Sequence, residues 1–373
     1  MWEEWTITET AAERPYWLAL STLMGIRRIS NLIAHYGSLS VAWRSLSWDV
    51  LRQIPLFSDE LAQQVLRSMR TLEPRTIEQQ LVKQGSRVLI PPEPDYPELL
   101  RHAPGAPATL YIRGHYDPTW LARSVAVVGT RQPSGNGAHI ARQLAGDLAR
   151  NGLTVVSGMA LGIDAAAHQG ALAVPQGRTI AVLGCGTDIV APPSHRSLYA
   201  KICERGLVVS EYPDGTPPAP SRFPPRNRII SGLSAGVIIV EAPEQSGALI
   251  TADFAAEQGR EVFAVPGSIL ERQSQGGHKL LRDGARLVTG AADVLDELGW
   301  GAPVPARQSN LSLPSLTAAE EGLYSLLNND PQSVERLIER TRLPAGELAS
   351  VLIQLEVKGV VRRMAGSKYV RSH

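Results

Sequence analysis

The chain has 373 residues, 43% of them hydrophobic and 20% charged, so it resembles a globular protein that is too long for one ordinary core. Because 37 lysines and arginines balance 36 acidic residues, any phosphate or nucleic-acid site must be a local concentration of charge. Cys185 and Cys203 form neither a disulfide framework nor a metal-binding spacing, so we expect a cytoplasmic protein without a metal site. The sequence has no apolar run as long as a membrane span and no signal peptide, so no membrane contact is expected.

Residues 1–74 are predicted to form a helical domain. Leu20, Leu23 and Ile26 have helical spacing, and Gly25 and Gly37 interrupt the pattern between short helices. Such helix–glycine–helix units resemble helix-hairpin-helix or SAM-like modules. Modules of this kind either hold a DNA backbone or only pack against their neighbours, and the sequence leaves both roles open.

Residues 75–300 alternate short apolar runs with amphipathic helical segments. Most of the runs are almost continuously hydrophobic, as expected for strands that are buried on both faces. This rhythm predicts an α/β domain with a Rossmann-like, doubly wound parallel sheet. The predicted strands are Arg87–Ile90, Ala108–Arg113, Val125–Gly129, Leu153–Ser157, Thr179–Leu183, Leu207–Glu211, Val237–Glu241 and Glu261–Val265.

Residues 301–316 are rich in proline and polar residues without periodicity, which predicts a linker. Residues 317–373 then predict three helices followed by a hairpin, the pattern of a winged-helix domain. Thr317 and Glu320 form a capping-box sequence at the first helix. The third helix, Ala345–Val357, would be the recognition helix, but it carries two glutamates and only Lys358 at its end. This composition favours a protein contact over DNA reading.

Glycine and hydroxyl residues follow most of the predicted parallel strands. Ligands of such sheets bind beyond the carboxyl ends of the strands, where glycine lets backbone N–H groups approach a phosphate. Ser246, Gly247 and Thr251, after the fifth of these strands, are therefore candidate phosphate-binding residues. The dinucleotide fingerprint G-x-G-x-x-G and the Walker A sequence are both absent, so no cofactor is expected.

The segment Phe223-Pro-Pro-Arg-Asn-Arg-Ile-Ile-Ser-Gly232 concentrates positive charge beside an aromatic residue. Arg222, Arg226 and Arg228 flank Phe223 and Asn227 just where a helix is predicted to begin. Guanidinium groups near helix N–H groups suit phosphate, and a phenyl ring can stack on a base. A solvated turn would also explain three basic residues.

The sequence offers little catalytic chemistry. Asp164 and His168 are four residues apart on a predicted helix, where they would form either an acid/base pair or, more commonly, a helix-stabilising pair. Cys185 follows a glycine at a strand end, but no neighbour in the sequence would activate it. We therefore expect no enzyme.

Several segments of the middle domain together resemble the DNA processing protein A (DprA, also called Smf) family. They are Val128-Gly129-Thr130-Arg131, Val156-Ser157-Gly158-Met159-Ala160-Leu161-Gly162-Ile163-Asp164, Ser210-Glu211-Tyr212-Pro213, Phe223-Pro224-Pro225-Arg226-Asn227-Arg228-Ile229-Ile230, Ser246-Gly247-Ala248-Leu249-Ile250-Thr251-Ala252 and Val265-Pro266-Gly267. The flanking helical and winged-helix segments fit the family's usual additions. The segment 191–195 departs from the family pattern, which carries Tyr-Pro and a later Asn there.

The resemblance implies a non-enzymatic homodimer that binds single-stranded DNA in a basic pocket, protects incoming DNA and loads the recombinase RecA on it during natural transformation. The family motifs carry over to Arg131, Phe223, Arg226, Asn227 and Arg228, and more loosely to Lys201. We expect the three arginines among them to meet in one pocket. Because the pocket edge is charged, the dimer surface is expected to be apolar and to lie at the far edge of the sheet, near Ile250–Phe263. The alternative is a nucleotide-processing enzyme of the phosphoribohydrolase type, although the loop at 246–251 lacks that family's extra glycines.

Overall fold

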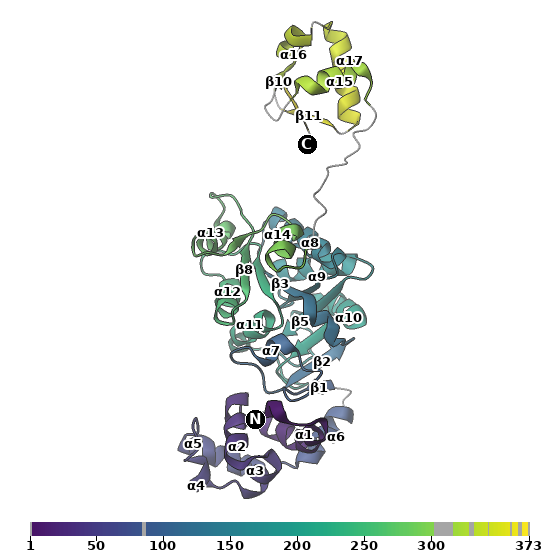
Figure 1. Cartoon of the computed structure of the whole chain (residues 1–373). Coiled ribbons are helices and arrows are strands. Elements are labelled where there is room, and N and C mark those ends of the chain that lie inside the picture. The colour runs from purple at the N-terminus through teal and green to yellow at the C-terminus, as the bar shows by residue number, and fades with distance from the viewer. Residues whose placement is uncertain are drawn as a thin grey trace. The chain divides into compact units, whose positions relative to one another are not determined.

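A computed structural model of the chain describes residues 2–83, 87–301, 316–327, 332–341, 343–358, 360–364 and 368–371. The chain divides into two compact units, Met1–Gly301 and Ala302–His373. The first contains N-terminal helices and an α/β core, and the second is a small helical unit with a three-stranded sheet (Figure 1).

The described residues of the first unit form a sheet of nine strands in the order β1-β2-β6-β5-β4-β3-β7-β8-β9. The strands from β6 to β9 in this order run parallel, and β2 and β1 pair antiparallel at one edge. The predicted α/β class with a doubly wound sheet is therefore confirmed. The bounds are β1 (Arg87–Leu89), β2 (Leu110–Gly114), β3 (Ser124–Val128), β4 (Thr154–Ser157), β5 (Arg178–Leu183), β6 (Leu207–Ser210), β7 (Gly236–Ile239), β8 (Glu261–Ala264) and β9 (Arg286–Leu287).

Successive side chains of the central strands enter two different apolar cores. In β3, Val125 and Val127 belong to one core, and Ala126 and Val128 belong to the other. All four are at most 3% exposed, so the continuous apolar run reflects burial on both faces. The two-residue strand β9 was not predicted, because both of its residues are exposed and give no apolar pattern.

Helices cover both faces of this sheet (Figure 1). The core of Val125 contains α8, α9 and α14, with α10 on the same face, and the core of Ala126 contains α7, α11 and α12, with α13 packed against it. The bounds are α7 (Glu98–Arg101), α8 (Gly135–Arg150), α9 (Ile163–Ala173), α10 (Arg196–Arg205), α11 (Phe223–Gly232), α12 (Gly247–Glu257), α13 (Gln275–Arg282) and α14 (Ala291–Glu297).

The N-terminal helices pack on the face of β1 and β2 that is turned away from the core of Ala126. Val88, Ile90 and Tyr111 lie in one apolar cluster with the helices. The predicted helices are present, whereas a domain boundary between residues 74 and 75 stays a prediction. The bounds are α1 (Ile7–Ser21), α2 (Ile26–Tyr36), α3 (Leu39–Ser45), α4 (Trp48–Leu51), α5 (Asp59–Met69) and α6 (Pro74–Lys83).

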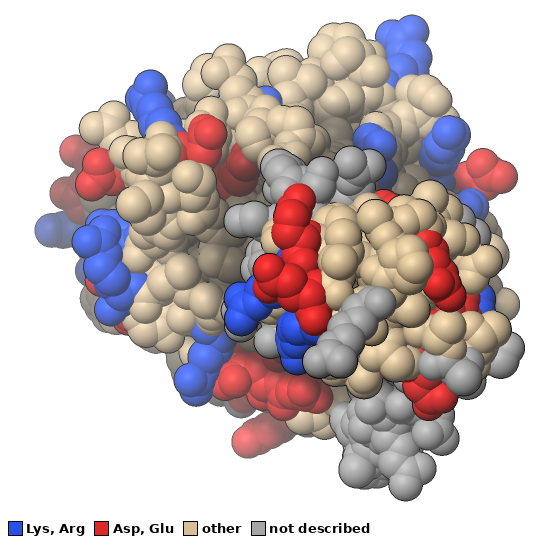
Figure 2. Space-filling model, turned by 90° about the horizontal axis from the view of Figure 1, so that it is seen from above, with Lys and Arg blue, Asp and Glu red and all other residues tan. Residues whose placement is uncertain are grey.

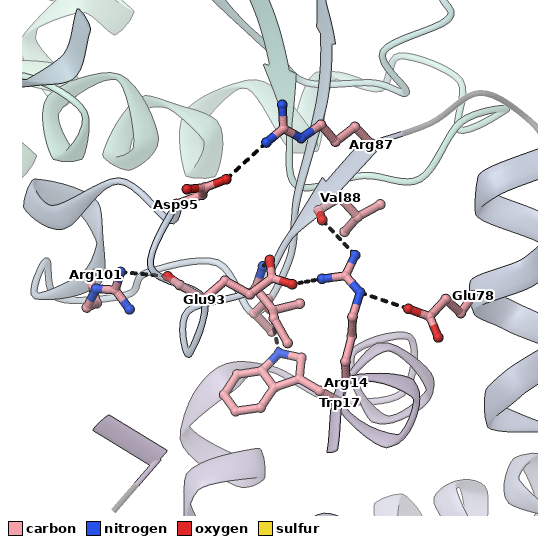
Figure 3. Close-up of polar contacts among 10 residues, drawn as sticks. Arg14, Trp17, Glu78, Arg87, Val88, Glu93, Asp95 and Arg101 are labelled. Carbon is pink, nitrogen blue, oxygen red and sulfur yellow. Dashed lines mark hydrogen bonds and ion pairs between the residues drawn. The ribbon is translucent and has the colours of Figure 1, made fainter. Parts of the chain in front are cut away.

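Polar contacts of α1 fix these helices to the sheet edge (Figure 3). Arg14 donates to Glu78 of α6 at 2.9 Å, to the carboxylate of Glu93 and to the carbonyl oxygen of Val88 at 2.9 Å. The indole N–H of Trp17 donates to the carbonyl oxygen of Ala108 at 2.7 Å. Arg14 thus bonds Val88 within β1 and Glu93 after it, and Trp17 bonds Ala108 just before β2. The helices and the two strands therefore form one packed body.

The second unit is a winged helix. Its three helices surround one apolar cluster, its sheet has the order β10-β12-β11, and the predicted capping box of Thr317 and Glu320 is present. The elements are α15 (Ala318–Leu326), β10 (Gln332–Ser333), α16 (Val334–Thr341), α17 (Ala345–Val357), β11 (Val361–Met364) and β12 (Lys368–Arg371). Lys358, at the end of α17, bonds the buried Glu320 carboxylate at 2.7 Å. The predicted linker, apart from its two ends, and the hairpin turn at 365–367 lie outside the described residues.

The face drawn in Figure 2 carries both signs of charge. On the face shown in Figure 2, the described Lys and Arg side chains lie among Asp and Glu rather than in a broad patch of one sign. Among the described helices, none is long and apolar enough to cross a membrane. A local site at the sheet edge therefore matters more than the field of the whole molecule.

Candidate nucleic-acid interface

The strand order reverses at β3, which places a crevice at the carboxyl edge of the sheet. From β3 the chain proceeds outward through β4, β5 and β6, and then returns to β7 on the other side of β3. A cavity of about 540 Å³ lies at this point. The lining residues that the sequence singled out are Arg131, Phe223, Arg226, Asn227, Ser246, Gly247 and Thr251.

Arg131 and Phe223 form one wall of the cavity. Arg131 follows β3 and is exposed, while Phe223 is the first residue of α11 and is half-buried. The guanidinium carbon of Arg131 lies 5.6 Å from the centre of the Phe223 ring, within the range of a cation–π contact. The pair presents a fixed positive charge beside an aromatic face.

Arg226 lies beneath the cavity and is only 4% exposed. Its Nη1 donates to the carbonyl oxygens of Gly158, at 2.6 Å, and of Val182, and its buried Nε has no hydrogen-bond partner among the described residues. A Cβ atom at Gly158 would lie 2.7 Å from this guanidinium, so only glycine leaves room for it. Arg226 thus joins the ends of β4 and β5 and brings a buried positive charge to the cavity floor.

Burial is the main influence on the ionisation of Arg226. It lowers the pKa of the guanidinium to about 10; the Asp164 carboxylate raises this pKa, and the positive charge of Arg131 lowers it. Arg226 is still charged at neutral pH. Arg131 and Arg226 both line the cavity, so an anion there would be attracted by both charges.

The N-terminus of α12 also lines the cavity. The hydroxyl oxygen of Ser246 caps the helix by accepting from the N–H of Ala248 at 3.3 Å, and Gly247 and Thr251 line the cavity one turn apart. The side-chain amide of Asn227 donates to the carbonyl oxygen of Gly247 at 3.2 Å, which ties α11 to α12. The positive end of a helix dipole therefore adds to the two arginines.

Two predicted residues lie outside the cavity lining. Arg228 is directed to Glu211, whose carboxylate it bonds at 2.6 Å, and both side chains are less than one-fifth exposed. Residues two apart on a helix do not share a face, so Arg226 and Arg228 point apart. The expectation that three arginines meet in one pocket is wrong for Arg228. Lys201 is exposed on α10 and is also absent from the lining; contact of either residue with DNA stays a prediction.

The cavity also contains polar residues that the sequence analysis missed. Gln132 follows Arg131, Gln245 precedes the cap of α12, and Arg272 reaches the cavity from the segment after β8. Pairing of Gln273 and Gly276 with the backbone of Ala242 brings Arg272 there. Each of these residues follows a parallel strand, as the glycine and hydroxyl candidates do, but none of them is a glycine or hydroxyl residue.

The residues considered for catalysis have structural surroundings. Asp164 accepts N–H groups from Gly158 and Ala160, and burial raises its pKa, whereas Nδ1 of His168 bonds the hydroxyl of Thr179 at 2.7 Å. The predicted pairing of Asp164 with His168 is therefore wrong. Cys185 is fully buried, and burial raises its pKa to about 11, which is the opposite of an activated thiol.

Comparison with known protein families identifies this architecture. Residues 87–299 match the family model described as DNA recombination-mediator protein A, and residues 307–367 match the DprA winged helix domain. The first match alone covers more than half of the chain. The chain belongs to the DprA (Smf) family. The family is one of DNA recombination mediators, and membership confirms the resemblance that the sequence motifs indicated.

Two Smf relatives align along nearly the whole chain, and a DprA relative aligns with about half of it. Protein Smf of Escherichia coli is 38% identical over 368 residues, covering 95% of this chain and 94% of that protein. Protein Smf of Synechocystis is 33% identical over 396 residues, covering 96% of this chain and 99% of the relative. DNA processing protein DprA of Streptococcus pneumoniae is 46% identical over 202 residues, which cover 54% of this chain and 71% of that protein.

Two solved DprA structures share the fold. The crystal structure of DprA from Streptococcus pneumoniae superposes with a TM-score of 0.66 at 35% identity, covering 79% of this chain and 99% of that one. The structure of DNA processing protein A from Helicobacter pylori, described for its single-stranded DNA binding mode, gives a TM-score of 0.51 at 30% identity, covering 57% of this chain and 95% of that chain.

Proposed function

We propose that this protein is a recombination mediator that binds single-stranded DNA in the cavity at the carboxyl edge of its sheet. The observation that carries the proposal is that Arg131 and Phe223, in cation–π contact, line the same cavity as the N-terminus of α12. A phosphate fits between the guanidinium groups and the helix terminus, and a base fits on the phenyl ring.

The composition of the cavity favours a single strand over a duplex. An aromatic face is accessible only to an unpaired base, and stacking tolerates every base because each has a π face. The Helicobacter pylori relative, whose structure concerns its binding of single-stranded DNA, supports the same ligand class here. We expect little preference for base identity.

RecA loading, protection of incoming DNA in natural transformation and homodimer formation are proposed from family membership. The sequence suggested an apolar dimer surface near Ile250–Phe263. Ile250 lines the cavity and Phe263 is fully buried, so a dimer contact in this segment would be made by the residues between them. The place of the dimer surface stays a prediction.

A phosphoribohydrolase-type enzyme is less well supported. Such an enzyme needs an acidic residue positioned to act on the ribose. Asp164 is the acidic residue among the cavity-lining residues, and its carboxylate is buried and accepts two backbone N–H groups. We propose a binding protein without enzymatic activity; release of free base from a nucleoside monophosphate would contradict this.

The test is a titration of the full chain with oligo-dT at several salt concentrations. We expect the logarithm of the association constant to fall linearly with the logarithm of salt concentration, at about 0.7 per phosphate contact. A blunt duplex of equal length should bind more weakly. Equal affinity for the duplex would overturn the cavity as the DNA site and would assign DNA binding to the winged helix.

A further inference from the structure

A second arginine–aromatic stack adjoins the first along the chain. The guanidinium carbon of Arg222 lies 5.2 Å from the centre of the Tyr212 ring, and both side chains are half-buried. Arg222 immediately precedes Phe223, the aromatic residue of the cavity wall. Tyr212 follows β6, so the two stacks come from different strand ends of the same sheet edge.

The end of β5 shows how the two stacks are joined. A Cβ atom at Gly184, just after β5, would lie 3.0 Å from the Phe223 ring and 3.4 Å from the carbonyl oxygen of Arg222. Residues 222 and 223 therefore cross directly over the end of β5. In the sheet order this strand lies between β6, which leads to Tyr212, and the β3–β4 region of the cavity.

The loop that carries the second stack is held in place. The backbone N–H of Gly186 donates to the carbonyl oxygen of Thr216 at 2.9 Å, and that of Gly215 donates to the Asp188 carboxylate at 2.9 Å. Nη1 of Arg222 donates to the carbonyl oxygen of Pro217. With four prolines between 213 and 220, the segment loses little conformational entropy on binding a ligand.

The acidic residues of this region are paired with other groups, and burial together with the neighbouring Glu211 carboxylate raises the pKa of Tyr212. Glu211 pairs with Arg228 at 2.6 Å, and Asp214 pairs with Arg113 at 3.1 Å. Asp188 accepts the N–H of Gly215, as described above. The positive charge of Arg222 is consequently available to a phosphate beside the exposed part of the Tyr212 ring.

We propose that Tyr212 and Arg222 form a second nucleotide subsite, which takes the base and phosphate that follow those held at Phe223 and Arg131. The inference rests on the proposed function and adds the path of the DNA. The single DNA strand runs from the cavity, over the end of β5, toward the end of β6. A row of two ring faces with an arginine at each matches successive nucleotides of a single strand.

The test compares Kd values for oligo-dT of increasing length, starting from the shortest that binds. With the wild type, affinity should rise when the oligonucleotide becomes long enough to extend beyond the cavity. Tyr212→Ala should leave the shortest oligonucleotide unaffected and weaken longer ones by about fivefold or more. Tyr212→Phe keeps the ring and should restore wild-type affinity, and Phe223→Ala should weaken all lengths.

A second measurement avoids any variant. A 2-aminopurine base moved along the oligonucleotide should be quenched by stacking at two adjacent positions when wild-type protein is added. Quenching at one position, or the wild-type length dependence in Tyr212→Ala, would overturn the second subsite. Equal loss at every length in Tyr212→Ala would also overturn it, since Tyr212 would then only support the loop. If the wild type binds no oligonucleotide of any length, the proposed function itself fails.

Discussion

The carboxylate of Glu241 accepts two hydrogen bonds from Ser134, one from its N–H at 2.9 Å and one from its hydroxyl at 2.5 Å. The backbone carbonyl oxygen of Glu241 also accepts from the N–H of Thr130 at 2.7 Å. Glu241 follows β7, and Ser134 caps α8. One residue therefore fixes both ends of the loop that carries Arg131, so it positions Arg131 without itself lining the cavity.

Replacing Glu241 with Ala should weaken oligo-dT binding through the position of Arg131. The free energy of unfolding should fall by about 1.5–3 kcal/mol, the usual contribution of hydrogen bonds to a charged group. The slope of log K against log salt should stay at the wild-type value, because the variant retains Arg131. Denaturant unfolding and the salt titration measure these effects. Glu244→Ala, at an exposed position between β7 and α12, is the control. Wild-type affinity in Glu241→Ala would contradict the positioning role.

Arg131 and Arg228 should differ in their salt dependence. Arg131→Ala removes an exposed charge from the cavity, so we expect weaker binding and a slope smaller by about 0.7. Arg228→Ala leaves the half-buried Glu211 without its partner, so we expect a loss of about 1–3 kcal/mol in stability and an unchanged slope. If Arg228→Ala lowers the slope and leaves the stability intact, Arg228 contacts phosphate as the sequence predicted.

His168 should make the protein sensitive to acid. Burial lowers its pKa from 6.5 to about 3, so between these values the unfolded chain binds a proton that the folded chain does not. The stability contribution of this group is full above about pH 6.5 and falls as the pH decreases toward 3. From pH 7 to pH 5 the wild type should lose about 2 kcal/mol more than His168→Asn. Urea unfolding at both pH values measures this.

The matched control is His139→Asn, which changes an exposed histidine of α8. It should show the wild-type pH dependence. The same decrease in stability for the wild type and His168→Asn would mean that His168 does not remain neutral in the folded protein.

A chain ending at residue 313 should keep most of the oligo-dT affinity. The exposed part of α17 carries Glu347 and Glu356, and Lys358 is paired with Glu320, so this recognition-helix candidate offers little attraction for phosphate. The first unit has its own cores and should fold alone, which circular dichroism can verify. Loss of nearly all binding in a folded truncation would show that the winged helix holds the DNA.

The sequence predicts the sheet well because burial on both faces leaves a continuous apolar run, as in β3 to β7. It identifies the loops of the cavity because their position at strand ends is a matter of topology. It does not predict the burial of Arg226, since side-chain depth depends on Gly158 and Val182 far along the chain. The position of Arg272 after β8 is visible in the sequence, but its approach to the cavity depends on backbone pairing between Gln273 and Ala242, which has no local signal.

The shared core of the N-terminal helices with β1 and β2 has an evolutionary consequence. Val88, Ile90 and Tyr111 are at most 4% exposed only because the helices cover them. A family member that consists of the α/β core alone would expose these three positions to water. Across the family, we therefore expect their polarity to co-vary with the presence of the helical segment: apolar residues in long members and water-compatible ones in short members.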